Sequence, residues 1–346
     1  MIRDLFSMDF LLLAIAGFLL TTIGVALFRG YAASAGILDH PNERSSHTIP
    51  VPRGGGIVIV LVCIGLYLIF SYVIGYPVSW WYIGGGSVIA GVSWLDDRRN
   101  LPPIVRLATQ AGAALASIYG HGYFSDLAIP IAGTSLPFGP LGAPLTFLWL
   151  VWMTNAYNFM DGIDGIAGLQ GVVAGLAWAL LGTMTANPAV CALGLIVCFS
   201  CLGFLVHNWS PARIFMGDVG SAFLGFTFAL LPLMTLEAAG KSSGWLLAAG
   251  ISFVWLFFFD TVSTLISRLI KGEKIWHAHR QHLYQRMVIL GTGHASVSAL
   301  YAALACTVSA ASLYVLKNGA IAEIVFVLSL LFSAAAILFL GFRDMR

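Results

Sequence analysis

The chain has 346 residues, of which 59% are hydrophobic and only 9% are charged, and its mean hydropathy is +0.90. A soluble domain carries roughly 25% charged residues, so no water-soluble fold can bury this much apolar surface. The net charge of +2 and the absence of a basic run argue against a nucleic-acid partner. The apolar stretches have the length of membrane-crossing helices. We therefore expect an all-α integral membrane protein with one transmembrane domain over residues 1–346.

Eleven apolar windows, separated by charges or Pro/Gly turns, are predicted as membrane spans. The first is too long for a signal-peptide core and has no convincing cleavage site, so we expect it to be retained. In chain order the spans lie near 10–28, 55–74, 78–95, 102–120, 144–160, 165–184, 188–206, 221–238, 245–266, 295–315 and 320–341.

The basic residues predict the orientation of this bundle. With a periplasmic N-terminus and a cytoplasmic C-terminus, all 17 lysines and arginines except Arg3, Lys241 and Lys317 fall in cytoplasmic segments. The external segment 121–143 has no Lys or Arg, and its short apolar runs around Gly and Pro turns indicate a small hairpin. The five cysteines lie in apolar stretches without metal-binding spacing, so we interpret them as small packing residues.

Most acidic residues fall at or near the cytoplasmic helix ends of this topology. Carboxylates near hydrocarbon are costly and usually mark a polar site or an ion pathway. Asp96 and Asp97 close the third span, where they could instead form a helix stop beside two arginines. Asp260 lies within the ninth span, about two turns from its cytoplasmic end, and is the observation that keeps a membrane transporter among the alternatives.

The segment Asn158-Phe-Met-Asp-Gly-Ile-Asp-Gly165 is the clearest local signal. Asp161 and Asp164 are three residues apart, so they would share a face of a helix. Asn155 and Asn158 precede them at the same spacing and offer amide groups to a hydroxyl, a base edge or a phosphate. The alternative interpretation is a solvated helix cap.

Asp218 lies between glycines in Phe215-Met-Gly-Asp-Val-Gly-Ser221, where its side chain could also cap the following helix. Hard oxygen ligands supplied singly by several loops suit Mg²⁺ or Mn²⁺ holding a diphosphate. Arg53, Arg213 and the basic loop from Lys271 to Arg286 would supply the cations that such an anion needs. The run Gly54–Gly56 indicates either close phosphate approach or a flexible turn.

The loop from His277 to Arg286 concentrates the remaining polar chemistry. Its three histidines, His277, His279 and His282, have no nearby Cys or carboxylate to complete a tetrahedral metal site, and the arginines disfavour a cation. The basic loop is therefore better suited to binding a phosphate than to binding a metal ion. Contact with the membrane surface is the alternative.

Taken in order, these motifs resemble the polyprenyl-phosphate N-acetylhexosamine-1-phosphate transferases (glycosyltransferase family 4). The resemblance covers nearly the whole chain and rests on Pro52–Gly56, Asp96-Asp97, Asn158–Gly165, Asn208 with Pro211–Ser221, and Arg280-Gln-His282.

This resemblance implies transfer of a sugar 1-phosphate from a UDP-N-acetylhexosamine to undecaprenyl phosphate at the cytoplasmic face of the bacterial inner membrane, releasing UMP, with Mg²⁺. It also implies contact with membrane lipids and suggests a homodimer. By analogy, Asp218 and Asp97 are the expected metal ligands, and Asp96, Asp97, Asp161, Asp164 and His282 are the expected catalytic residues. The expected substrate-binding residues are Arg53, Asn155, Asn158, Asn208, Arg213 and Arg280.

The sequence departs from the family pattern after His282, which is followed by Leu-Tyr-Gln-Arg rather than by further histidines. The departure favours the short branch that initiates O-antigen or other surface polysaccharides with GlcNAc, FucNAc or QuiNAc. The alternatives are the phospho-N-acetylmuramoyl-pentapeptide transferase of peptidoglycan synthesis and, in other classes, a transporter or a non-catalytic scaffold. The scaffold would lack motif carboxylates, and all of them are present.

Overall fold

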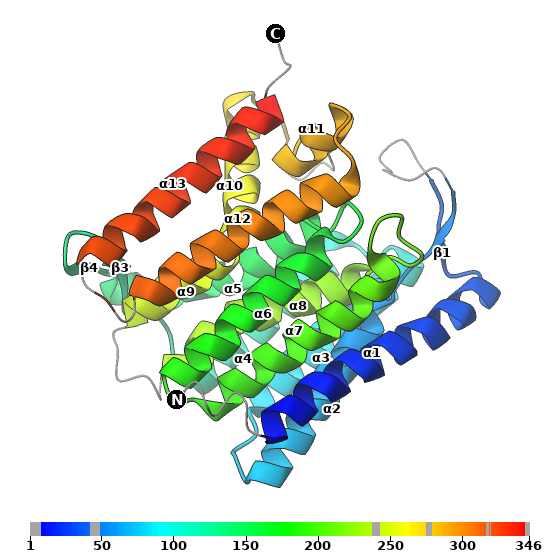
Figure 1. The fold of residues 1–346 in the computed structure, drawn as a ribbon, viewed down its shortest axis with the longest axis horizontal. Helices are drawn as coiled ribbons and strands as arrows, with labels where there is room; N and C mark the ends of the chain where they lie inside the picture. Colours follow the sequence, from blue (N-terminus) through cyan, green and yellow to red (C-terminus); the bar gives the residue numbers. More distant parts are fainter. Residues whose placement is uncertain are drawn as a thin grey trace.

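The computed structural model describes residues 8–41, 49–236, 243–274, 279–315, 318 and 320–342. Long helices dominate this part of the chain, and Figure 1 shows several of them running side by side through the molecule. In chain order they are α1 (Met8–Ser34), α2 (Gly56–Ile74), α3 (Trp80–Arg99), α4 (Pro103–His121), α5 (Gly142–Phe159), α6 (Ile166–Met184), α7 (Pro188–Asn208), α8 (Asp218–Leu236), α9 (Ser243–Phe253), α10 (Trp255–Ile270), α11 (Leu283–Ile289), α12 (His294–Val315) and α13 (Ala320–Phe342).

The expected all-α membrane architecture is confirmed, and each predicted span coincides with a helical segment. Among the described helices, seven are long and apolar enough to cross a membrane, or eight if the bent pair α9–α10 forms one span. The number of eleven crossings and their orientation stay predictions.

The predicted span 245–266 is not one straight helix, because α9 and α10 meet at an angle of 83°. The break lies at Val254, between the two helices. A break inside a bundle leaves carbonyl groups without their helical partners. Here the side chain of Gln170 on α6 donates a hydrogen bond of 2.7 Å to the Phe253 carbonyl. The neighbouring helix therefore compensates for the bend.

Two short antiparallel ladders complete the described elements. β3 (Asp126–Ile129) pairs with β4 (Thr134–Pro137), which confirms the hairpin predicted in segment 121–143. β1 (Leu38–Asp39) pairs with β2 (Val51–Pro52). The two ladders lie at opposite ends of the molecule in Figure 1, and the β1–β2 pair lies beside the C-terminal end of α1.

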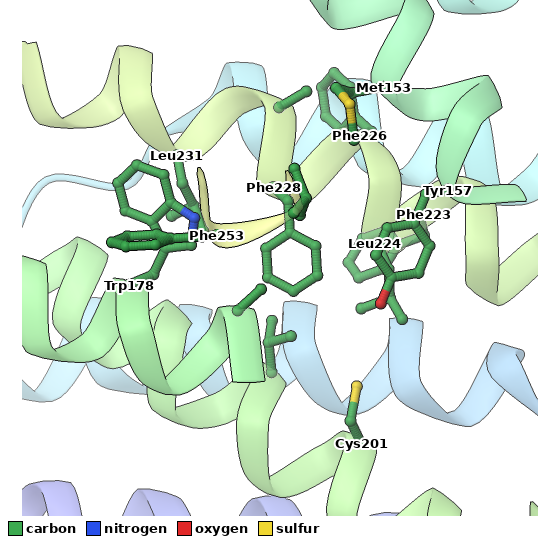
Figure 2. Close-up of a cluster of buried hydrophobic side chains, with 14 of the residues drawn as sticks. Met153, Tyr157, Trp178, Cys201, Phe223, Leu224, Phe226, Phe228, Leu231 and Phe253 are labelled. Atoms are coloured by element: carbon green, nitrogen blue, oxygen red, sulfur yellow. The ribbon is translucent and has the colours of Figure 1, made fainter. Parts of the chain in front are cut away.

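The centre of the molecule is packed with large aromatic side chains around α8. Figure 2 shows Phe223, Phe226 and Phe228 of α8 among side chains from neighbouring helices, and all three are almost fully buried. Tyr157 of α5 lies with its ring centroid 5.6 Å from that of Phe228, and Trp178 of α6 meets Phe253 edge to face at 5.2 Å. The core fixes the helices whose ends carry the polar loops.

Small residues allow α6 and α7 to approach closely, as is common between membrane helices. A Cβ added at Gly175 would lie 2.7 Å from the Cys198 backbone nitrogen, and one at Gly182 would lie 2.4 Å from that of Cys191. Cys63, Cys191, Cys198 and Cys201 are buried free thiols, whereas Cys306 is exposed. The packing interpretation is confirmed for the four buried cysteines.

Candidate active site

Three carboxylates from two different helix ends share two arginines. Arg53 Nη2 lies 2.6 Å from Asp97 Oδ1 and 3.0 Å from Asp218 Oδ1. Arg106 Nη1 lies 2.8 Å from Asp96 Oδ2 and 3.3 Å from Asp218 Oδ2. Asp218 is therefore the central member, because it meets both cations. We call Asp96, Asp97, Asp218, Arg53 and Arg106 the carboxylate cluster.

Backbone hydrogen bonds hold the Arg53 loop against the loop before α8. The Phe215 N–H donates to the Pro52 carbonyl at 2.8 Å, and the Gly55 and Gly56 N–H groups donate to the carbonyls of Phe215 and Met216, both at 2.9 Å. A Cβ added at Gly56 would lie 2.4 Å from the Gly220 Cα. The glycines therefore allow two protein loops to pack directly on each other, which replaces the flexible-turn interpretation.

Asp97 caps α8 from a different part of the chain. Its Oδ1 and Oδ2 accept hydrogen bonds of 3.1 Å from the N–H groups of Asp218 and Val219, and its side chain is 2% exposed. The side chain of Asp218 is engaged by the two arginines instead. The interpretation of Asp218 as the cap of its own helix is wrong, because Asp97 performs that function.

Asp161 and Asp164 do not share a helical face, which corrects the sequence-based expectation. α5 ends at Phe159 and α6 begins at Ile166, and Gly165 before α6 has a φ of +78°, a conformation that glycine adopts readily. Both aspartates therefore lie in an irregular loop whose side chains can point in different directions.

Asp161 faces the charges of the carboxylate cluster. Burial, and then the negative charge of Asp218, raise the pKa of Asp161 to about 7, although Arg53 lowers it. No hydrogen bond or ion pair of this carboxylate is found within the described ranges. Asp161 thus adds a fourth negative group to a region with two cations.

Asp164 points to a different set of groups. Its Oδ2 lies 3.4 Å from His294 Nδ1 of α12 and accepts a hydrogen bond of 3.2 Å from the Ala212 N–H. Burial raises the pKa of Asp164, but the hydrogen bonds from His294 and Ala212 outweigh burial and bring the pKa below its ordinary value. These contacts favour a positioning role, and its expected catalytic role stays a prediction.

The three predicted asparagines take different places. Asn208 is buried; its Oδ1 accepts from the Gly165 N–H at 3.0 Å and its Nδ2 donates to the Ile214 carbonyl at 2.9 Å, so it ties together two loops. Asn155 exchanges hydrogen bonds of 2.6 and 3.2 Å with Gln110 of α4. Asn158 is half-buried.

Of the other predicted arginines and histidines, only some lie near the carboxylate cluster or its neighbouring cavity. Arg213 is exposed, and no ion pair joins its guanidinium to the cluster among the residues described. Arg280 is half-buried, and His282 is buried. Burial, and then the neighbouring His282 and Arg268, lower the pKa of His279 to about 4, so a neutral His279 adds no charge for a phosphate. His277 lies outside the described residues.

A cavity of about 700 Å³ opens beside the cluster. Arg106 belongs to both, since it lines this cavity and binds Asp96 and Asp218. Its polar lining comes from Arg106, Asn155, Thr261, His279, His282 and Gln285, and its apolar lining from Pro103, Ile104, Leu107, Leu148, Val151, Trp152, Ala156 and Phe159.

A second, almost wholly apolar cavity of about 460 Å³ extends toward the β3–β4 hairpin. It shares Leu148 and Trp152 with the first cavity and reaches Phe124, Leu127 and Phe138 around the hairpin. The two cavities together follow α5 from the polar end of the molecule toward the hairpin end. They could hold a molecule with an anionic head and a long apolar tail.

The donor set fits a divalent cation that shares its coordination with a ligand. Mg²⁺ in proteins is usually bound through one or two carboxylates together with phosphates and waters. The described residues contain no ready-made group of three or more His, Cys, Asp or Glu ligands. They do contain four carboxylates near two arginines, and the pKa of Asp161 is raised by burial first and then by the negative charge of Asp218.

Arg106 was missed as a site residue from the sequence, where it appeared only as one of many cytoplasmic charges. Its position in the sequence could have indicated this role. Arg106 lies in the first turn of α4, just beyond the Asn-Leu-Pro-Pro turn that separates this helix from Asp96 and Asp97. This turn folds α4 back beside α3, so the cation returns to the carboxylates that precede it.

A comparison with known protein families shows which kind of enzyme the region with the carboxylates resembles. The family model described as "Glycosyl transferase family 4" matches residues 79–236. This range contains Asp96, Asp97, Asp161, Asp164 and Asp218. The match therefore links the helices that carry these carboxylates to a class of glycosyl transferases.

The relatives narrow the class. The chain is 28% identical to the "Probable undecaprenyl-phosphate N-acetylglucosaminyl 1-phosphate transferase" of Bacillus subtilis over 92% of this chain and 87% of that protein. It is 27% identical to the "Decaprenyl-phosphate N-acetylglucosaminephosphotransferase" of Mycobacterium tuberculosis over 83% of this chain and 77% of that protein. It is also 27% identical to the "Undecaprenyl-phosphate alpha-N-acetylglucosaminyl 1-phosphate transferase" of Escherichia coli over 79% of this chain and 75% of that protein. Together with the family model, these relatives support membership in the polyprenyl-phosphate N-acetylhexosamine-1-phosphate transferase family.

Proposed function

We propose that the protein transfers an N-acetylhexosamine 1-phosphate from a UDP-sugar to undecaprenyl phosphate at the cytoplasmic face of the bacterial inner membrane. In this reaction an oxygen of the lipid phosphate forms a bond to the phosphorus that carries the sugar. The bond between that phosphorus and the bridging oxygen breaks, and UMP leaves with this oxygen. The product is a lipid-linked diphosphate sugar.

The observation that carries the proposal is the junction between the carboxylate cluster and the elongated cavity. Arg106 contacts Asp218 and also lines the cavity, so a lipid phosphate at the polar end would lie next to the cluster. The apolar lining that continues past Leu148 and Trp152 suits the prenyl chain. A water-soluble acceptor would gain nothing from such a lining.

The arginines can serve the two anionic substrates by exchanging partners. Arg53 and Arg106 bind carboxylates of the protein through charge-assisted hydrogen bonds, and phosphate oxygens accept the same bonds. Positioning and charge stabilisation are the main contributions a protein makes to phosphoryl transfer. The cluster therefore supplies cations at the place where the reacting phosphates meet.

Asp218, with Asp97 and Asp161 nearby, is proposed to hold Mg²⁺, and Mn²⁺ would suit the same oxygen ligands. The bound ion would offset the repulsion between the two phosphates and the negative charge that develops during transfer. Asp96 is proposed to orient Arg106 toward the acceptor, because the two side chains lie 2.8 Å apart.

The proposed sugar is GlcNAc or a 6-deoxy relative such as FucNAc or QuiNAc, for the first step of O-antigen or another surface polysaccharide. The departure from a histidine-rich motif after His282 supports this branch. The GlcNAc transferases among the relatives support the general reaction.

The test is a donor panel with the purified full chain in lipid nanodiscs containing undecaprenyl phosphate. We expect UMP release with at least one UDP-N-acetylhexosamine in Mg²⁺, and no release after EDTA. Asp9→Asn, which removes an exposed carboxylate in the first turn of α1, is the matched control for cluster variants and should retain full activity. No UMP from any donor, including the pentapeptide-bearing muramoyl donor, would refute the proposal.

A further inference from the structure

Asp260 is a fully buried carboxylate outside the carboxylate cluster. It lies on α10, five residues after the start of that helix, and its exposed fraction is 0%. A buried charge is costly unless hydrogen bonds satisfy it, so its partners indicate what it does. Figure 1 shows α10 and α11 near the same end of the molecule as the start of α12, and all three helices contact one another.

Five donors surround this carboxylate, and three of them belong to the segment 282–284. Oδ1 lies 3.1 Å from His282 Nδ1 and accepts from the Leu283 N–H at 2.9 Å. Oδ2 accepts from the Tyr284 N–H at 3.2 Å and from the Tyr301 hydroxyl at 2.8 Å. The remaining donor is the Thr264 hydroxyl at 3.2 Å. Asp260 therefore holds both the ring and the backbone at the start of α11.

The contact with His282 determines which ring nitrogen faces the cavity. A carboxylate that accepts from Nδ1–H fixes the tautomer and the orientation of an imidazole. The ring also lines the 700 Å³ cavity, together with Arg106 and Asn155. Since Asp260 occupies the Nδ1 side, Nε2 is the nitrogen that can accept a hydrogen bond from a ligand in the cavity.

We propose that Asp260 is a positioning residue for His282: it holds the imidazole as the Nδ1–H tautomer and leaves Nε2 as a proton acceptor for a substrate bound in the cavity, with Tyr301 fixing the other carboxylate oxygen. This inference rests on the proposed function for its catalytic consequence, but the geometry itself is independent of the reaction. It also gives the intramembrane carboxylate a role that requires no transport pathway.

The kinetic test is a double-mutant cycle on UMP release. His282→Ala is expected to lower kcat about 100-fold or more, as for loss of a positioned acid–base group, and Asp260→Asn about 10- to 100-fold with a smaller change in KM. In the His282→Ala background, Asp260→Asn should change kcat less than about threefold, because residues that act as one unit are not additive. Tyr301→Phe should cost less than Asp260→Asn.

Asp126→Asn is the matched control for loss of a buried carboxylate. Asp126 is buried in the β3–β4 hairpin and accepts from the Gly244 N–H at 3.1 Å, so its substitution disturbs packing without reaching His282. Equal losses from Asp260→Asn in both backgrounds, or equal losses from Asp126→Asn and Asp260→Asn, would overturn the positioning role.

A second readout separates this inference from the proposed function. Solid-state NMR of ¹⁵N-histidine-labelled protein distinguishes the two tautomers, and His282→Ala identifies the signal among the eight histidines. We expect protonated Nδ1 in the wild type and a changed tautomer or a mixture in Asp260→Asn. If the wild type released no UMP but showed this pattern, the function would fail and the positioning would stand. Wild-type protonation at Nε2, or an unchanged signal in Asp260→Asn, would overturn it.

Discussion

The carboxylate cluster and the buried Asp260 with its hydrogen-bond donors both stabilise carboxylates in a membrane protein, but they do so with different kinds of partner. Asp218 has a side chain that is 19% exposed and is held by two arginines, which bind phosphates equally well. Asp260 is completely buried and is held by ring, hydroxyl and backbone donors. The first arrangement can release its partners to a ligand, whereas the second is saturated and can only orient its neighbours.

The largest effect is expected at the centre of the cluster. Asp218→Asn keeps the shape of the side chain but removes the charge shared by Arg53 and Arg106, and we expect UMP release to fall by at least about 1,000-fold. The measurement is kcat at saturating donor, with a magnesium titration and Asp9→Asn as the control. A loss below tenfold would mean that Asp218 is not the central ligand.

A smaller effect is expected at the junction with the cavity. Arg106→Gln retains a hydrogen-bond donor but loses the cation that meets Asp96 and Asp218. We expect kcat/KM for the lipid acceptor to fall about 10- to 100-fold, equivalent to about 1.4–2.7 kcal/mol. The KM of the UDP-sugar should change less. An effect confined to the UDP-sugar would place Arg106 on the donor side.

The two aspartates of the Asn158–Gly165 motif should separate activity from stability. Asp164→Asn loses its charge beside His294 and weakens its bond from the Ala212 N–H, which we expect to cost about 1–3 kcal/mol and to lower the Tm. Asp161→Asn should lower activity without lowering the Tm, because its charge is not paired by a neighbouring side chain. Thermal unfolding and UMP release of both variants test this. The reverse pattern would contradict the division of roles.

The pH dependence of metal-free stability should be the most modest effect. The folded-state pKa of Asp161 is about 7 against an ordinary value of 3.8, so the folded protein binds this proton more tightly than the unfolded chain. Ionisation then costs stability, and its contribution falls as pH rises from about 4 through about 7. In EDTA the Asp161→Asn variant should show a flatter Tm profile between pH 5 and 7.5 than the wild type. Parallel profiles would argue against the raised pKa.

The sequence predicts the helices and the loops that carry the site because hydrophobic length and charge position act locally. Asp96, Asp97, Asp161 and Asp218 were all identified in this way, and all except Asp161 form ion pairs with Arg53 or Arg106. Periodicity could not show that Asp161 and Asp164 diverge, since the loop that carries them leads into α6 through Gly165, whose N–H donates to the buried Asn208, a residue distant in sequence. Nor could it show the bend at Val254, whose stabilisation by Gln170 is a tertiary contact.

Asp97 also decides where an anion can bind in this protein. The N-terminus of a helix is a common phosphate-binding position, because its free N–H groups and its dipole favour negative charge. At α8 the N–H groups of Asp218 and Val219 are already occupied by the Asp97 carboxylate. The field that a substrate diphosphate meets there is therefore set by side chains and their counter-ions rather than by the helix dipole, and each contribution can be altered by a single substitution without removing a helix.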